Sequence, residues 1–349
     1  MRKHIAIVFL LTCFIGFLSI QSCDYFNKKK EIDSDVVAVT DTTKGSKLNL
    51  LDAEIKKNPG NPNLYHERAK ELLNVAKYDD ALKDMYYATN LDSFNTDYYF
   101  TIADIYIEKA DGPKAVLALE KAVSIAPERA DLKVEVGRYC LYMKDYKKSI
   151  LYLDEALKKD VFNADAYFLK GILYKEQKNE AKAISNFQTC IEQEPKYADA
   201  YVQLGMLYAS NKNDLAIQYF DNALKADPTA TDAIYQKALY IQNKKQYTKA
   251  IDIYKEMVPV DSKNERVFYN IGYCYFQIDS IDKAHKNFSI AIDLNPQYAE
   301  AYYNRGLCGL TKNDMTDAQY NFDQALRIDP NMKAAQAALD DIKKQLLNK

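Results

Sequence analysis

The sequence predicts an all-α solenoid, in which short helical hairpins stack in series instead of surrounding one globular core. The main observation is a column of small residues that returns every 34 positions, with a single step of 33. Its members are Ala81, Ala115, Ser149, Ala183, Ala216, Ala250, Ala284 and Ala318. So strict a period is the signature of a repeat array, whose units contact only their neighbours. Two further columns, one of small and one of large residues, have the same period.

The spacing within one repeat fits two packed helices. With the recurrent alanine numbered position 20, position 8 is always Ala or Gly, as in Ala103 and Gly171, and position 24 is large, as in Leu119 and Phe187. Positions 4, 8 and 11 share one face of a first helix, and positions 20, 24 and 27 share one face of a second. The small residues let the helices approach closely. Proline at position 32, as in Pro195, is expected to end the second helix.

This alternation closely resembles the tetratricopeptide repeat (TPR), over residues 62–331 as eight units. The resemblance implies a right-handed superhelical solenoid whose first helices line a concave groove. Residues 47–61 are predicted to be a lone second helix, and residues 332–349 a C-terminal capping helix. In the sixth unit Pro259 comes early, which predicts a short second helix and leads to the hypothesis of a hinge at Val258–Asn264.

The N-terminus has the pattern of an export signal. Arg2 and Lys3 precede the apolar run Ile5–Ile20, which is short for a membrane span. The following Ser22-Cys23 resembles a bacterial lipobox, which implies a signal peptide at residues 1–22 and lipid attachment at Cys23. A simple cleaved signal and an uncleaved anchor are the alternatives. Residues 23–46, polar and without a period, are expected to be a flexible tether after the lipidated Cys.

Composition narrows the function classes. The net charge of −2 gives no basic footprint for nucleic acid. After Cys23 the chain has two histidines, His66 and His285, too far apart for one site in an array, and it shows no phosphate-binding loop and no metal-ligand spacing. We therefore expect no enzyme activity, no cofactor and no metal. The cysteines of the repeats are predicted to be small buried residues: Cys140, Cys190, Cys274 and Cys308.

The TPR resemblance places the binding groove on the first helices. Position 5 carries aromatic residues and position 6 carboxamides: Phe100, Phe168, Tyr235, Tyr269 and Tyr303, with Gln203, Gln236, Asn270 and Asn304. A carboxamide both donates and accepts, so it can pair with a peptide unit of an extended chain. The alternative is that these residue types occur in the family without any ligand. Acidic residues at position 2, such as Asp97, either favour a basic ligand or simply stabilise helix N-termini.

These observations predict a membrane-anchored scaffold or adaptor of the bacterial cell envelope. Its partners would be proteins or extended peptides, with contact to the membrane through the N-terminal lipid and none to nucleic acid. We expect an exported protein at the periplasmic face of the outer membrane rather than the inner membrane, although Asp24 favours inner-membrane retention in some bacteria. The alternative is a ligand-capture lipoprotein of the glycan or nutrient uptake type on a TPR-like scaffold.

Overall fold

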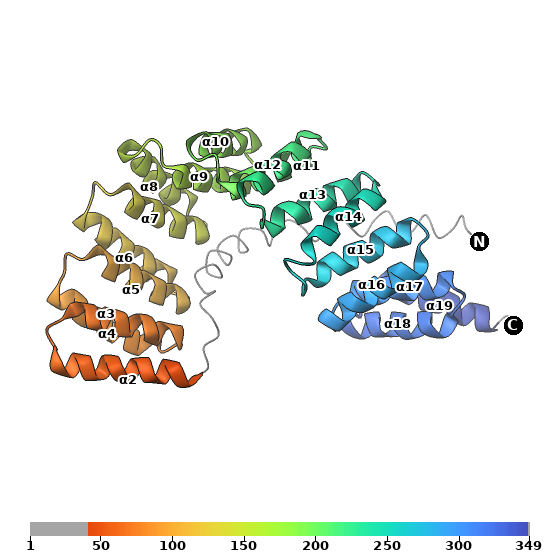
Figure 1. The fold of residues 1–349 in the computed structure, drawn as a ribbon, viewed down its shortest axis with the longest axis horizontal. Helices are drawn as coiled ribbons and strands as arrows, with labels where there is room; N and C mark the ends of the chain where they lie inside the picture. The colour runs from red at the N-terminus through yellow and green to blue at the C-terminus, as the bar shows by residue number, and fades with distance from the viewer. Residues whose placement is uncertain (1–40, 348–349) are drawn as a thin grey trace. The chain divides into compact units, whose positions relative to one another are not determined.

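The computed structural model describes residues 41–347, and within this range the chain forms 18 α-helices and no strand (Figure 1). The prediction of an all-α array of hairpins is confirmed. By its internal contacts the described chain divides into two compact units, residues 41–194 and residues 195–347, called here the N-terminal and C-terminal units. The predicted signal peptide, Cys23 and the expected tether up to residue 40 lie outside the described residues.

The N-terminal unit consists of one single helix followed by four hairpins. The single helix α2 begins at Asp41, earlier than the predicted residue 47, and ends at Lys57. Each hairpin pairs a first helix of 13 residues with a second helix of 14. The hairpins are α3 (Pro62–Asn74) with α4 (Tyr78–Leu91), α5 (Thr96–Glu108) with α6 (Gly112–Ile125), α7 (Ala130–Tyr142) with α8 (Tyr146–Lys159), and α9 (Ala164–Glu176) with α10 (Glu180–Gln193).

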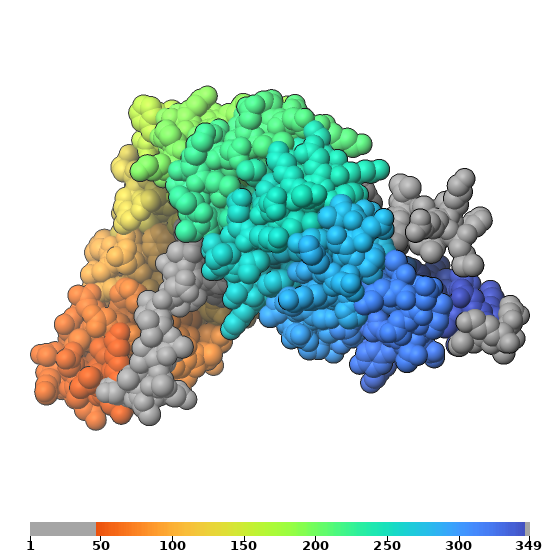
Figure 2. Space-filling view, turned by 45° about the vertical axis from the view of Figure 1, so that its right-hand side comes forward, coloured from red at the N-terminus to blue at the C-terminus, as the bar shows by residue number. Residues whose placement is uncertain are grey.

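The C-terminal unit repeats the same plan with four hairpins and a last single helix. In the space-filling view this unit runs from green through cyan to blue (Figure 2). The elements are α11 (Ala198–Ser210) with α12 (Leu215–Ala226), α13 (Thr231–Asn243) with α14 (Tyr247–Met257), α15 (Glu265–Gln277) with α16 (Ile281–Leu294), α17 (Ala299–Thr311) with α18 (Met315–Ile328), and the cap α19 (Lys333–Leu347).

The seam of each hairpin is built as the spacing predicts. All eight members of the recurrent column have no exposed surface. Ser149, the one polar member, donates a hydrogen bond of 2.8 Å to the carbonyl of Gly137, so its buried hydroxyl is satisfied. At position 8 a glycine is needed where a phenylalanine stands at position 24, because a Cβ on Gly171 would lie 2.5 Å from Cε1 of Phe187.

Every hairpin turns through the same backbone motif. The turn residue has a positive φ near 54–61° although none is glycine: Ala76, Ala110, Lys144, Lys178, Lys212, Lys245, Asp279 and Asn313. The next residue donates its N–H to a carbonyl five residues back, as from Asn179 to Tyr174 at 2.8 Å. This is a Schellman ending, which satisfies carbonyls that the helix end leaves open.

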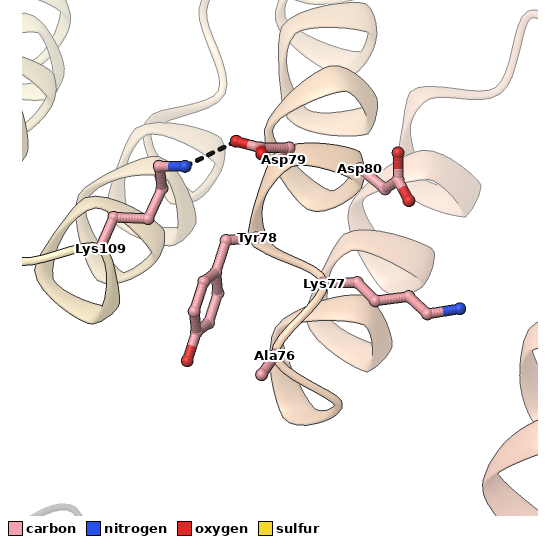
Figure 3. Close-up of a pocket in the computed structure, with 6 residues that line it drawn as sticks. All are labelled: Ala76, Lys77, Tyr78, Asp79, Asp80 and Lys109. Atoms are coloured by element: carbon pink, nitrogen blue, oxygen red, sulfur yellow. Dashed lines mark hydrogen bonds and ion pairs between the residues drawn. The ribbon is translucent and has the colours of Figure 1, made fainter.

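The first of these turns shows how neighbouring hairpins are joined at this edge. Figure 3 shows the turn at Ala76 and Tyr78, with Lys109 of the next hairpin reaching Asp79. The Lys109–Asp79 ion pair measures 2.6 Å and lies beside a shallow depression on the surface. The same pairing recurs between Lys244 and Asp214 at 2.5 Å, and between Lys312 and Asp282 at 2.9 Å.

The predicted departures from the repeat appear in the helices. The early Pro259 is matched by the 11-residue α14, and the unit with one residue fewer has the 12-residue α12. However, one buried cluster contains Ile241, Tyr254 and Val267, which come from α13, α14 and α15. The core is therefore continuous across Val258–Asn264, so the hinge hypothesis finds no break in packing at this point.

Candidate protein-binding surface

Successive first helices contact one another through side chains 35 residues apart. In the N-terminal unit the Tyr98 hydroxyl donates to Asn63 Oδ1 at 2.7 Å, and His66 Nε2 and Thr101 Oγ1 are 2.8 Å apart. We call the side of the first helices that carries positions 2, 5, 6 and 9 the first-helix face. These contacts make it continuous from α3 to α5 within that unit.

The C-terminal unit has a regular version of these contacts. Asn270 Nδ2 donates to the Tyr235 hydroxyl at 3.0 Å, and Asn304 Nδ2 donates to the Tyr269 hydroxyl at 3.0 Å. Both asparagines are only 7% exposed. The prediction that these two carboxamides meet a bound peptide therefore needs correction. Both side chains are nearly buried, and one N–H of each donates to a tyrosine of the preceding unit.

The other predicted residues of the C-terminal unit stay partly accessible on the same face. They are half-buried, between the core and solvent: Gln203, Tyr235, Gln236, Tyr269 and Tyr303. Arg266 stacks over the Tyr235 ring at 5.0 Å, and the Tyr269 ring lies 4.9 Å from that of Tyr298. Hydrogen bonds thus link the first helices α13, α15 and α17, and the two asparagines act there as nearly buried donors rather than as exposed contact residues.

In the N-terminal unit the prediction of one binding residue, Phe168, is wrong. Phe168 has no exposed surface, and its ring lies 5.6 Å from that of Phe187. Tyr269 and Tyr303 pack against a phenylalanine in the same way, but their hydroxyls need a hydrogen-bond partner or water, whereas the ring of Phe168 has no polar atom and can be buried whole. Phe100 is half-buried and packs against the core cluster of α2 to α7, so only part of its ring reaches the face.

Sequence reasoning missed a set of cations that join four of the eight hairpins to the preceding helix. Arg68 on α3 bonds Asp84 at 2.6 Å and reaches Asp52 on α2 at 2.7 Å. The hydrogen bonds that Arg68 donates to Asp84, and then to Asp52, raise the pKa of its guanidinium against the opposing effect of burial. The same position carries Lys170, Lys237 and Arg305, which bond Asp154, Asp221 and Ser289 respectively. In the sequence, the signal for these contacts was a basic residue 13 positions before the recurrent alanine of the same unit.

Burial shifts the pKa values of the half-buried His66 and of three buried cysteines. Burial, and then the charge of Lys70, lower the pKa of His66 to about 4, so the ring is neutral at neutral pH. Burial raises the pKa of the Cys140 thiol to about 11 and those of Cys274 and Cys308 to about 12. Like Cys190, they are buried, as predicted, and none of the four forms a disulfide. Residues 41–347 hold no cluster of three or more acidic, His or Cys side chains suited to a metal ion.

The family models agree with the helical plan. Models described as tetratricopeptide repeat match residues 96–129, 164–197 and 269–333, and the first two segments coincide with predicted units. The chain contains tetratricopeptide repeats. A model described as anaphase-promoting complex, cyclosome, subunit 3 matches residues 209–289 of this TPR array.

Curated relatives are similar to only part of the chain. The general transcriptional corepressor trfA of Dictyostelium discoideum is 33% identical over 79 residues, which is 23% of this chain and 6% of the relative. The corepressor ssn6 of Schizosaccharomyces pombe is 30% identical over 79 residues, covering 23% and 7%. The chain therefore spans less than a tenth of either relative's length.

Solved structures share the fold. Pseudomonas aeruginosa pilF superimposes with a TM-score of 0.54 at 15% identity, covering 62% of this chain and 98% of that one. The Cut9–Hcn1 hetero-tetramer of the anaphase-promoting complex gives a TM-score of 0.52 at 19% identity, covering 84% and 58%. At such identities the likeness shows the TPR fold and nothing of a shared ligand. Among the described helices, none is both long and apolar enough to cross a bilayer.

Proposed function

We propose that this TPR chain is a lipid-anchored scaffold of the bacterial cell envelope, which holds protein partners on its first-helix face. The observation that carries the proposal is the row of half-buried tyrosines on α13, α15 and α17, in which hydrogen bonds link each of these first helices to the next. Tyrosine supplies large, rigid, amphipathic contact area of the kind that protein interfaces favour. None of the described hairpins carries an inserted segment, so nothing favours the glycan-capture alternative.

The scaffold role can be tested by placing a photoreactive residue at Gln236 on this face. The matched control is Tyr320, an exposed residue on the second helix α18 of the same unit. We expect crosslinks to envelope proteins from position 236 and far fewer from position 320. Equal yields at the two positions, or a set of partners dominated by cytosolic proteins, would refute the proposal.

The membrane anchor rests on the lipobox-like Ser22-Cys23, and a separate experiment addresses it. Cys23→Ala should abolish labelling by an alkynyl fatty acid and shift the protein from the membrane to the soluble fraction. The wild-type protein should sediment with the outer membrane. Labelling that persists in the variant would exclude Cys23 as the attachment site without touching the scaffold role.

A further inference from the structure

Three tyrosines occupy equivalent places on successive first helices of the C-terminal unit. Tyr235, Tyr269 and Tyr303 lie on α13, α15 and α17. The first two each accept a hydrogen bond of 3.0 Å from the carboxamide of the following first helix, Asn270 and Asn304 respectively. We call each of these pairs a rung. Because the asparagines are almost fully buried, water competes little for these bonds.

The third tyrosine has no rung. The residue 35 positions after Tyr303 is Ala338 on α19, and both pack in the same core cluster. The methyl group of alanine cannot donate, and within residues 41–347 no side chain or backbone group is hydrogen-bonded to the Tyr303 hydroxyl. Since that hydroxyl is unpaired yet absent from the buried, unsatisfied atoms, it reaches solvent.

The Tyr303 ring is nevertheless held in place. It lies 5.6 Å from the buried ring of Phe322, and burial raises the pKa of its hydroxyl, which therefore keeps its proton. The half-buried Phe276 and Leu310 belong to the same cluster and add apolar surface. The hydroxyl is thus a fixed polar group beside apolar surface, as in small binding sites generally.

We propose that the Tyr303 hydroxyl anchors a carboxamide of a bound peptide, so that an Asn or Gln side chain of the partner forms the third rung. The carboxamide is inferred from the two internal rungs, in which the same hydroxyl position accepts from an amide N–H. This inference rests on the proposed function, since it names the chemistry that the first-helix face would recognise. A single such hydrogen bond should change affinity by about 3- to 10-fold.

Two variants test the inference from opposite directions. Tyr303→Phe removes the hydroxyl, whereas Ala338→Asn supplies an internal donor that would occupy it. The probe is a library of phage-displayed random dodecapeptides, selected on the purified full-length protein. We expect the selected peptides to share one Asn or Gln, and both variants to bind a selected peptide about 3- to 10-fold more weakly. Tyr320→Phe, on the exposed side of α18, should bind as the wild type does.

Stability separates this effect from damage to the fold. Ala338→Asn should keep or raise the melting temperature, since it completes a rung, and Tyr303→Phe should leave it unchanged. Replacing the shared Asn or Gln of the peptide by Leu should weaken binding to the wild type but not weaken binding to Tyr303→Phe any further.

The outcomes distinguish a failure of this inference from a failure of the proposed peptide-binding function. Peptides that lack a shared carboxamide, or that bind both variants as tightly as the wild type, would overturn the third rung and leave peptide binding intact. A wild-type protein that enriches no peptide over an albumin control would overturn both.

Discussion

Within each hairpin, the residue at position 8 of the first helix and the residue at position 24 of the second helix fill the same space between the helices. Gly171 and Gly205 give their space to Phe187 and Phe220, since an added Cβ would lie 2.5 Å from either ring. In the second unit an alanine, Ala103, takes the same position and the partner is a leucine. The two positions are therefore coupled, and a change at one should be judged together with the other.

Gly171→Ala should lower the free energy of unfolding by about 1–3 kcal/mol, because the new methyl group overpacks against Phe187. Adding Phe187→Leu should restore part of that loss, although Phe187→Leu alone is destabilising. Chemical denaturation of the two single variants and the double variant measures the coupling. Strict additivity of the three values would contradict the shared-space explanation.

The half-buried His66 predicts a pH dependence of stability. Its pKa is about 4 in the fold, against the ordinary 6.5 expected when unfolded. Between these values the unfolded chain binds a proton that the folded chain does not, so this group lowers stability as the pH falls from 6.5 towards 4. Above pH 6.5 it contributes nothing.

His66→Gln, which keeps a polar partner for Thr101 and does not titrate, should lose that dependence. Denaturation midpoints of the wild type and the variant, measured from pH 7 to pH 4, should change relative to each other, with the wild type losing more. A constant difference across this range would show that His66 has the same pKa in the fold as in the unfolded chain.

At the scale of the elements, the hairpin turn repeats one backbone motif with no glycine. A non-glycine residue in the left-handed region costs about 1–2 kcal/mol, which is partly offset because glycine would lose more entropy on folding. The Schellman hydrogen bonds, such as Asn179 to Tyr174, and the packing of the two helices hold the turn in this conformation.

Lys178→Gly should therefore stabilise the protein by up to about 1 kcal/mol, since the exposed Lys178 has a φ of 58°. Lys178→Val at the same position should destabilise it, because a β-branched residue tolerates that conformation poorly. Thermal unfolding of both variants measures the effect. A lower melting temperature for the glycine variant would mean that flexibility of the turn outweighs its strain.

For the whole molecule, stability comes from local clusters in series rather than from one core. The last cluster joins α17 and α18 to the cap α19 through Phe322, Ala335 and Leu339. A repeat array needs such a cap because its final hairpin would otherwise expose an apolar face. The cap also stands where the first helix of a further unit would be, which is why Ala338 meets Tyr303.

Leu339→Asp should cost about 3 kcal/mol or more and promote aggregation, because it places a charge in this nearly closed cluster. Lys343→Gln, on the exposed side of the same helix, should have almost no effect. Thermal unfolding and size-exclusion chromatography check both variants. Normal behaviour of Leu339→Asp would show that α19 does not cap the array.

The sequence alone determined the helical hairpins, because their signal is local. Position 8 and position 24 lie within one unit, so a small residue at Gly171 and a large one at Phe187 already imply the contact between them. The early Pro259 predicted a shorter helix for an equally local reason, the missing N–H. The tyrosines Tyr235 and Tyr269 were placed on the accessible face by the same repeat position.

Only the tertiary structure decided what those side chains do. The bonds from Asn270 and Asn304 to tyrosines depend on how one hairpin rests on the next. That docking joins residues 35 positions apart and is set by packing across units, for which the sequence has no local signal. The unpaired hydroxyl of Tyr303 follows from it, since only the position of α19 shows which residue stands where the next asparagine would be.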